Sequence, residues 1–175
     1  MEYSIEVKQA LLINATYGNM LLKNKGTKNG GTQFERLTQV ALLSKGLTVV
    51  YDTRDCLVAG IDRFSTLIYD SGLEKGKTRE LDLYIAELDT IVECKYQGPN
   101  RGTTHQKYPN VIMDVKMGEF GEQPKLFIVM HNDCEDLEEW HLSFQKHVYQ
   151  EKALDSRLAN VECFYGLPEL LNFIK

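Results

Sequence analysis

The sequence contains no apolar run that approaches the roughly 20 residues a membrane-spanning helix needs. Its first residues carry neither the basic nor the apolar region of a secretory signal. These two absences predict a cytoplasmic protein with no membrane partner. Internal repeats and low-complexity tracts are absent too, and 43% hydrophobic with 26% charged residues is an ordinary globular composition. A length of 175 residues therefore predicts one domain over residues 1–175.

Cysteine and histidine occur four times each, but not at metal-binding spacings. The cysteines form no C-x-x-C pair, which argues against a zinc ribbon and a disulfide framework. The histidines show no H-E-x-x-H pattern, so structural or surface roles are expected for most of them. The residues are Cys56, Cys94, Cys134, Cys163, His105, His131, His141 and His147.

Periodicity predicts alternating helices and strands. Helices are expected over residues 4–23, from Thr32 to just before Gly46, from Thr103 or Thr104 onward, over 135–150 and over 167–174. Strands are expected over 47–51, 64–69, 125–130 and 161–165. Thr32 with Glu35 matches a capping box, Pro109 should kink or restart its helix, and Pro168 suits a first helical position. The pattern predicts a mixed sheet between helices.

Acidic residues outnumber basic ones, which gives a net charge of −5. That balance argues against indiscriminate nucleic-acid binding, because affinity for phosphate comes from concentrated Lys and Arg. The distribution is uneven, however. Residues 1–118 hold 15 Lys or Arg against 14 Asp or Glu, whereas residues 119–175 hold 5 against 11.

A strip without acidic residues extends from Lys95 to Met113. It also contains Arg101, His105 and Lys107, so it is locally basic. Such a strip could contact a nucleic-acid phosphate, and the alternative is a solvated loop.

The stretch from Arg79 to Lys95 predicts a β-hairpin. Two runs of strand-forming residues flank a short polar turn near Leu88 and Asp89. We expect Thr78–Glu87 to pair with Thr90–Tyr96 in an antiparallel manner.

With the turn centred between Leu88 and Asp89, Asp82 lies opposite Lys95. Glu93 then shares the face of Lys95 and is the diagonal neighbour of Asp82. A register shift of one residue would separate the two carboxylates. The opposite, apolar face is expected to carry Leu81, Leu83, Ile85, Val92 and Cys94.

Two carboxylates beside an ammonium group suit phosphodiester hydrolysis. Carboxylates are hard oxygen ligands for Mg²⁺, which keeps several waters, and the lysine can orient one of those waters. The alternative is a surface salt bridge between Asp82 and Lys95 that contributes little to stability.

Asp82 followed by Glu93-Cys94-Lys95 resembles the signature of the PD-(D/E)XK nuclease superfamily. Three further motifs, within residues 76–110, resemble those of small phage and bacterial members. Leu81 stands where many members have proline, and Glu80 shares the face of Asp82, so Glu80 is an alternative first ligand. The motifs are Gly76-Lys77-Thr78, Glu93-Cys94-Lys95-Tyr96-Gln97 and Gly102-Thr103-Thr104-His105-Gln106-Lys107-Tyr108-Pro109-Asn110.

This resemblance implies an α/β restriction-endonuclease-like fold, with a mixed β-sheet flanked by α-helices. It implies a Mg²⁺-dependent deoxyribonuclease, with Mn²⁺ as a substitute, in the cytoplasm of a bacterial or phage-infected host cell. A homodimer is expected, because cutting two opposed strands needs two sites. The metal ligands would be Asp82, Glu93 and the main-chain carbonyl of Cys94; Lys95 would position the attacking water, Glu35 would support the metal, and Arg101, His105, Gln106 and Lys107 would contact DNA.

Three functions remain open. The compact chain favours a structure-selective enzyme, such as a junction resolvase or a recombination or repair nuclease, which needs shape and phosphate contacts more than base contacts. A type II restriction or homing endonuclease is the first alternative. A catalytically inactive DNA-binding or assembly module with the same fold is the second.

Overall fold

The computed structural model describes residues 30–51, 81–97, 104–121, 124–132 and 138–174. The helix expected over 4–23, the strand expected over 64–69, Cys56 and Cys134 lie outside these residues. The elements are α2 (Gly30–Ser44), β1 (Val49–Tyr51), β2 (Leu83–Ile85), β3 (Thr90–Gln97), α4 (Thr104–Lys116), β4 (Leu126–Asn132), α5 (Glu138–Leu154), the 3₁₀-helix η4 (Ser156–Leu158), β5 (Val161–Tyr165) and α6 (Gly166–Phe173).

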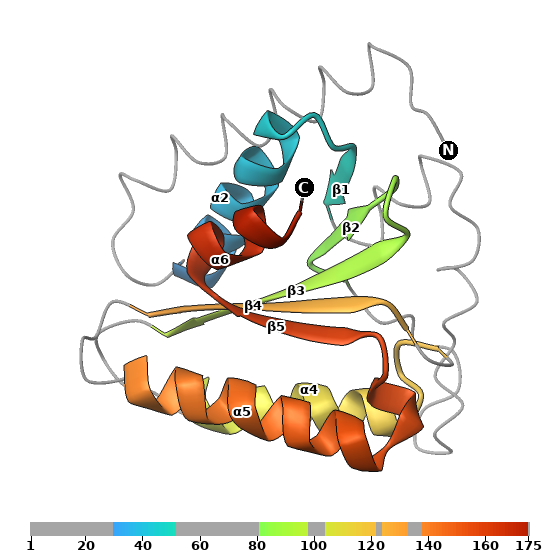
Figure 1. Cartoon of the computed structure of the whole chain (residues 1–175). Coiled ribbons are helices and arrows are strands. Elements are labelled where there is room, and N and C mark those ends of the chain that lie inside the picture. Colours follow the sequence, from blue (N-terminus) through green and yellow to red (C-terminus); the bar gives the residue numbers. More distant parts are fainter. Residues whose placement is uncertain (1–29, 52–80, 98–103, 122–123, 133–137, 175) are drawn as a thin grey trace, which may run out of the picture.

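The described strands form one mixed sheet in the order β1-β2-β3-β4-β5. The first three are antiparallel, whereas β3, β4 and β5 run parallel. A short turn joins β2 to β3, and the crossovers through α4 and α5 place β4 and β5 parallel to β3. Helices α2 and α6 lie on one side of the sheet, and α4 and α5 on the other (Figure 1). The predicted α/β class, a mixed sheet flanked by helices, is therefore confirmed.

The hairpin register differs from the predicted one by two residues. Leu83 pairs with Val92 and Ile85 with Thr90, so the turn spans residues 86–89. Asp89 adopts a positive φ of 54°, and its amide donates to the Ala86 carbonyl at 3.3 Å. The predicted pairing of Asp82 with Lys95 is therefore wrong. Because the shift is even, the side chains within the two paired strands keep their predicted faces.

The core consists of two apolar layers, one on each side of the sheet. In β4, Leu126, Ile128 and Met130 belong to the layer under α4 and α5, and Phe127 and Val129 to the layer under α2 and α6. All five are at most 7% exposed, so the predicted central strand covered on both sides is confirmed.

The predicted apolar face of the hairpin is confirmed with one exception. Leu83, Ile85, Val92 and Cys94 lie in the layer under α2 and α6. Leu81, which precedes β2, instead packs in the opposite layer. Its predicted position is wrong, because strict alternation does not hold outside the regular strand.

Helix α2 starts two residues earlier than predicted, at Gly30. Thr32 is therefore not its N-cap, Glu35 is not a capping-box residue, and both predictions are wrong. The predicted end is confirmed: Gly46 has a φ of 79°, and its amide donates to the Leu43 carbonyl at 2.9 Å.

Proline positions account for two further differences. Pro109 lies inside one uninterrupted helix, α4, and does not restart it. Pro168 is the third residue of α6, because that helix begins at Gly166 rather than Leu167. Pro168 lies in the first turn of α6, where an amide has no helical acceptor to lose. Pro109 is the sixth residue of α4, so there proline removes one hydrogen bond to the carbonyl four residues earlier, and the helix nevertheless continues to Lys116.

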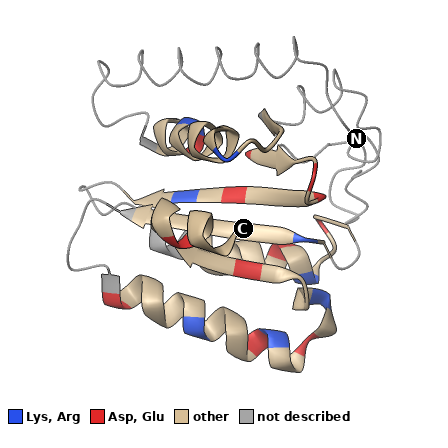
Figure 2. Ribbon diagram, turned by 45° about the horizontal axis from the view of Figure 1, so that its top comes forward, with Lys and Arg blue, Asp and Glu red and all other residues tan. Residues whose placement is uncertain are grey.

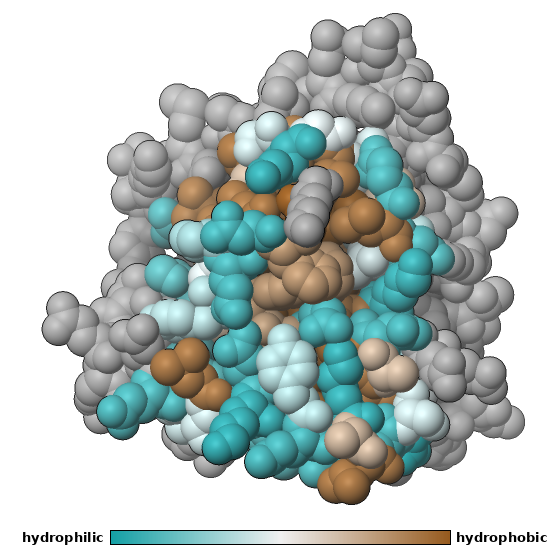
Figure 3. All heavy atoms as spheres, in the orientation of Figure 1, coloured by the Kyte–Doolittle hydropathy of each residue, from teal (hydrophilic) through white to brown (hydrophobic). Residues whose placement is uncertain are grey.

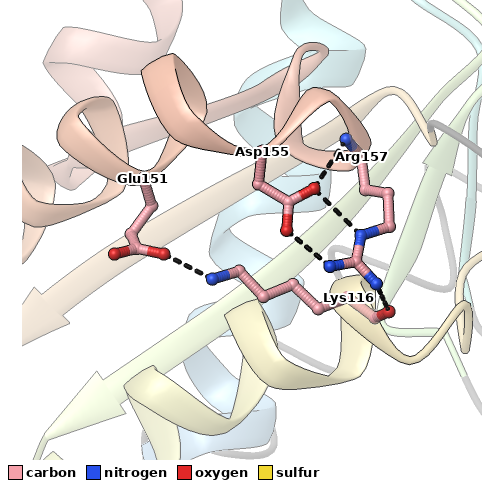
Figure 4. A network of polar contacts seen from close by, with 4 residues as sticks. All are labelled: Lys116, Glu151, Asp155 and Arg157. Atoms are coloured by element: carbon pink, nitrogen blue, oxygen red, sulfur yellow. Dashed lines mark hydrogen bonds and ion pairs between the residues drawn. The ribbon is translucent and has the colours of Figure 1, made fainter.

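A polar network joins the end of α4 to α5 and η4 (Figure 4). Lys116 pairs with Glu151, and the Arg157 guanidinium donates to the Lys116 carbonyl at 2.6 Å. Arg157 also donates to both oxygens of Asp155, at 2.9 and 2.6 Å, which holds the pKa of Asp155 down at about 2. The carbonyl of the last residue of α4 thus receives a side-chain donor.

The face seen in Figure 1 is mainly hydrophilic over α5, and apolar side chains gather nearer α6, where Phe173 is 53% exposed (Figure 3). No helix within the described ranges has the length and apolar character that crossing a membrane requires.

Candidate functional site

Charged residues are rare in the described strands, as Figure 2 shows. Only Glu93 and Lys95 of β3 and Glu162 of β5 carry charge there. Glu93 is 5% exposed, in a strand of β-branched and apolar residues that would otherwise exclude it. Burial of a carboxylate in a central strand costs free energy unless an opposite charge or a hydrogen-bond donor compensates it.

The partner of Glu93 is Lys95. The ammonium nitrogen Nζ lies 2.5 Å from Oε1 of Glu93, and the two side chains are 16% and 7% exposed. Residues i and i+2 of a strand share one face, so this contact follows from the strand itself.

Asp82, the residue immediately before β2, lies beside the strand that carries Glu93 and Lys95. Its Oδ2 accepts a hydrogen bond of 2.7 Å from the main-chain amide of Cys94. Continuing the observed register by one residue would place Asp82 opposite Glu93. The carboxylates of Asp82 and Glu93 therefore lie on neighbouring segments, Asp82 just before β2 and Glu93 in β3.

The carbonyl of Cys94 points to the same side as its amide. In β3, the amide of Ile91 donates to the Lys125 carbonyl beside β4, at 2.9 Å. Main-chain groups alternate along a strand, so those of Cys94 face the opposite neighbour, β2, and Asp82. The predicted oxygen donor of Cys94 is thus directed toward the Asp82 side of the site.

The electrostatics of the site are dominated by the burial of its charged groups, followed by the repulsion between neighbouring carboxylates. Burial raises the pKa of the Asp82 carboxyl to about 8, helped by Glu93 and Glu35 and opposed by Lys95 and the Cys94 amide. Burial lowers the pKa of Lys95, but Glu93 and Asp82 raise it by more, so the net shift is upward. The lysine is therefore a stable cation beside carboxylates that repel one another.

Glu35 reaches this site from α2, which packs on β3. Its charge raises the pKa of both Asp82 and Cys94. For the Cys94 thiol, burial is the larger cause, followed by Asp82, so the thiol remains protonated and unsuited to nucleophilic attack. The contribution of Cys94 to any chemistry is through its main chain.

The donor chemistry fits a hard divalent cation. Two carboxylates and a carbonyl are all oxygen donors, which Mg²⁺ prefers, and Mg²⁺ commonly keeps several waters and takes one or two carboxylates. In the part of the chain that the structure describes, no cluster of three or more His, Cys, Asp or Glu side chains is arranged to hold a metal. The fit is thus to an ion held by few protein ligands.

The residues predicted to contact DNA fall at the edge of the described chain, or outside it. Glu80 and Arg101 lie outside it, as do the side chains of His105, Gln106 and Lys107. The backbone of the last three forms the first turns of α4. Of the predicted site residues, the structure therefore brings together Asp82, Glu93, Cys94, Lys95 and Glu35.

Sequence reasoning missed two groups that surround the site. Gln97 is 3% exposed and shares the face of Glu93 and Lys95, which alternation along E-x-K-x-Q could have indicated. Tyr108, whose hydroxyl lies 3.2 Å from Nε2 of His141, also lies 3.5 Å from the Lys95 carbonyl. No local pattern could have indicated this pair, because its members are 33 residues apart.

A groove of about 350 Å³ lies elsewhere, near the amino-terminal ends of β3 and β4. Its lining includes Leu88, Lys125, Phe127 and Phe173 but none of the candidate site residues.

Comparison of the chain with models of protein families, with curated proteins and with solved structures finds no match.

Proposed function

We propose that the chain is a metal-dependent deoxyribonuclease of the PD-(D/E)XK type, with a restriction-endonuclease-like fold. One observation carries this proposal: Asp82 is fixed to the main chain of Cys94, while the flanking Glu93 and Lys95 form a partly buried ion pair on the same strand. A salt bridge for stability alone would not require a second, crowded carboxylate with a raised pKa.

The topology supports the fold part of the proposal. Helix α2 precedes the antiparallel strands β1, β2 and β3, and α4 leads from β3 to the parallel strand β4. The acidic residue before β2 and the E-x-K sequence on β3 are thus brought together by the same hairpin that the resemblance implies.

Each side chain has a role that its geometry allows. Asp82, Glu93 and the Cys94 carbonyl would hold Mg²⁺ or Mn²⁺, and the Cys94 amide orients Asp82 toward it. When bound, the ion supplies a Lewis acid for the attacking water and the scissile phosphate. Lys95 would orient the water and stabilise phosphate charge, and Glu35 would support the ion or its water from α2.

DNA is the proposed substrate. Arg101, His105, Gln106 and Lys107 come from the locally basic strip, and Tyr108 places α4 beside the carbonyl of Lys95. We propose a structure-selective nuclease, because a compact chain favours recognition through shape and phosphate contacts. We further propose that the protein acts as a homodimer in the cytoplasm.

The test is cleavage of supercoiled plasmid, linear duplex and a four-way junction in Mg²⁺ or Mn²⁺, with EDTA as a control. We expect metal-dependent cutting that Lys95→Ala reduces at least about 100-fold, as expected for loss of a positioned proton-transfer or charge-stabilising group. Lys152→Ala is the matched control, because Lys152 forms a similar ion pair with Glu162, at 2.6 Å, away from the site. It should cut like the wild type.

The substrates separate the possible enzymes. Preference for the junction supports a resolvase or repair nuclease, and discrete fragments from linear duplex would indicate a restriction or homing endonuclease instead. DNA binding that is independent of metal, without any cutting, would replace the enzyme with a binding module.

A further inference from the structure

The ion pair of the candidate site occupies an atom that a metal ligand would use. Nζ of Lys95 lies 2.5 Å from Oε1 of Glu93, within hydrogen-bond distance. A divalent cation that binds Glu93 through this oxygen has to displace the ammonium or share the oxygen with it. The contact is therefore a competition between two cations for one carboxylate.

The carboxylate of this pair is more enclosed than those of the two other lysine ion pairs seen within the described ranges. The Glu93 side chain is 7% exposed, compared with 25% for Glu162 paired to Lys152 and 24% for Glu151 paired to Lys116. Screening by water is weaker at such a site, so the charge of Lys95 has a larger effect on its neighbours.

A second carboxylate adds to this effect. Asp82 lies beside the pair, on the neighbouring strand, with Oδ2 bound to the Cys94 amide. Two carboxylates side by side repel each other unless a cation lies between or beside them. Lys95 interacts with both carboxylates, through an ion pair with Glu93 and electrostatically with Asp82.

We propose that Lys95 is a built-in counter-ion that competes with the divalent cation for Glu93 and thereby sets how weakly the site binds metal. This inference rests on the proposed nuclease function, and it adds a regulatory role to the residue. The ammonium stabilises the carboxylates until a divalent cation replaces it, and the displaced ammonium is then available to the water and phosphate.

Two opposite effects follow for a variant that lacks the charge. Removal of a positive charge next to a cation site strengthens cation binding. The same removal leaves two carboxylates without their counter-ion and destabilises the fold when no divalent cation is supplied. A merely structural role for Lys95 predicts the second effect without the first.

The experiment is isothermal titration calorimetry of the full chain with Mn²⁺ and with Mg²⁺, for the wild type and Lys95→Met. Thermal unfolding in EDTA and in excess metal is measured alongside. For Lys95→Met we expect metal affinity at least about tenfold higher, a lower Tm in EDTA and a larger metal-induced rise in Tm than in the wild type. Where Lys95→Met does not fold, Lys95→Gln takes its place with the same expected gain.

Lys152→Met is the control. This substitution removes the same charge and breaks the 2.6 Å ion pair between Lys152 of α5 and Glu162 of β5. It should leave the metal affinity unchanged. Tighter metal binding by Lys152→Met would show that the effect arises from the net charge of the protein alone, and it would overturn the proposal.

The outcomes separate the two hypotheses. Equal or weaker metal binding by Lys95→Met, while the wild type binds metal and cuts DNA, overturns the counter-ion role and leaves the nuclease function intact. Absence of metal binding in both proteins removes the metal site, and both hypotheses fail together. Binding by the variant that is undetectable in the wild type supports the counter-ion role.

Discussion

The carboxylate of Asp82 accepts a hydrogen bond of 2.7 Å from the main-chain amide of Cys94, a residue of the neighbouring strand β3. The contact fixes one oxygen of this acidic side chain to the backbone of the neighbouring strand. It also places Asp82 beside Glu93 and Lys95, so the chemistry of the site depends on how the hairpin is registered.

Cys94 is expected to act through its main chain. Cys94→Ala should retain DNA cleavage near the wild-type rate, because its amide and carbonyl are unchanged. Loss of a buried sulfur should cost about 1 kcal/mol of unfolding free energy, measured by urea denaturation. Cys163→Ala, at a fully buried cysteine of β5, is the matched control. A large loss of cleavage in Cys94→Ala alone would show that the thiol takes part.

The pH dependence of stability should reveal Asp82. The pKa of the Asp82 carboxyl is about 8 in the folded protein against an ordinary value of 3.8, so the folded state binds the proton more tightly. The resulting stabilisation is complete below pH 3.8 and is lost as pH rises toward 8, because unfolding releases this proton. Each unit of difference in pKa between the folded and unfolded states corresponds to about 1.4 kcal/mol of unfolding free energy, before neighbouring groups change their own protonation.

Asp82→Asn should flatten this dependence. In urea unfolding with EDTA between pH 4 and about 8, the variant should lose less stability than the wild type and become the more stable of the two at the upper end. Asp155→Asn is the contrasting control. The pKa of Asp155 is lowered to about 2, so its stabilisation is present above pH 3.8 and is lost as pH falls below that value. Parallel curves for the wild type and Asp82→Asn would contradict the prediction.

The central strand β4 should be the most sensitive part of the described core. Ile128 is fully buried, so Ile128→Ala should reduce the unfolding free energy by about 2–5 kcal/mol through lost burial and a residual cavity. Leu154, which is 83% exposed at the end of α5, is the control, and Leu154→Ala should change it by less than about 0.5 kcal/mol. Similar losses in both variants would disprove the assignment of the core.

The outer edge of β5 is capped by side chains. Nε2 of Gln145 donates to the Cys163 carbonyl at 2.7 Å, and the Tyr165 amide donates to Glu169 at 2.5 Å. Gln145 also donates to Glu169 at 2.9 Å, which links the two caps. Edge strands with open amides and carbonyls invite pairing with another chain, and these caps oppose it.

Removal of both caps should therefore promote self-association. The double variant Gln145→Ala with Glu169→Ala is expected to form larger species than the wild type in size-exclusion chromatography with light scattering. Gln150→Ala, at an exposed position of the same helix, should behave as the wild type. An unchanged mass for the double variant would show that the caps do not protect this edge.

Sequence patterns predict those strands and helices for which one local signal dominates. Val161–Tyr165 was predicted with its observed bounds, and β4 was predicted as a central strand because its apolar run lacks alternation. Errors arose at element ends. Thr32 matches a preferred N-cap, yet α2 begins two residues earlier, at Gly30, because threonine is also tolerated inside a helix and so does not fix where the helix starts.

The sequence by itself determined which side chains of β3 share a face. Alternation places Glu93 and Lys95 together, with Val92 and Cys94 on the apolar side, whatever the partner strand is. Only the tertiary structure decided what they meet. The contact of Asp82 with the Cys94 amide depends on a turn of four residues rather than two, and the approach of Glu35 depends on how α2 packs. Periodicity acts over two or four residues, whereas these contacts join distant parts of the chain whose register is set by the packing of both apolar layers.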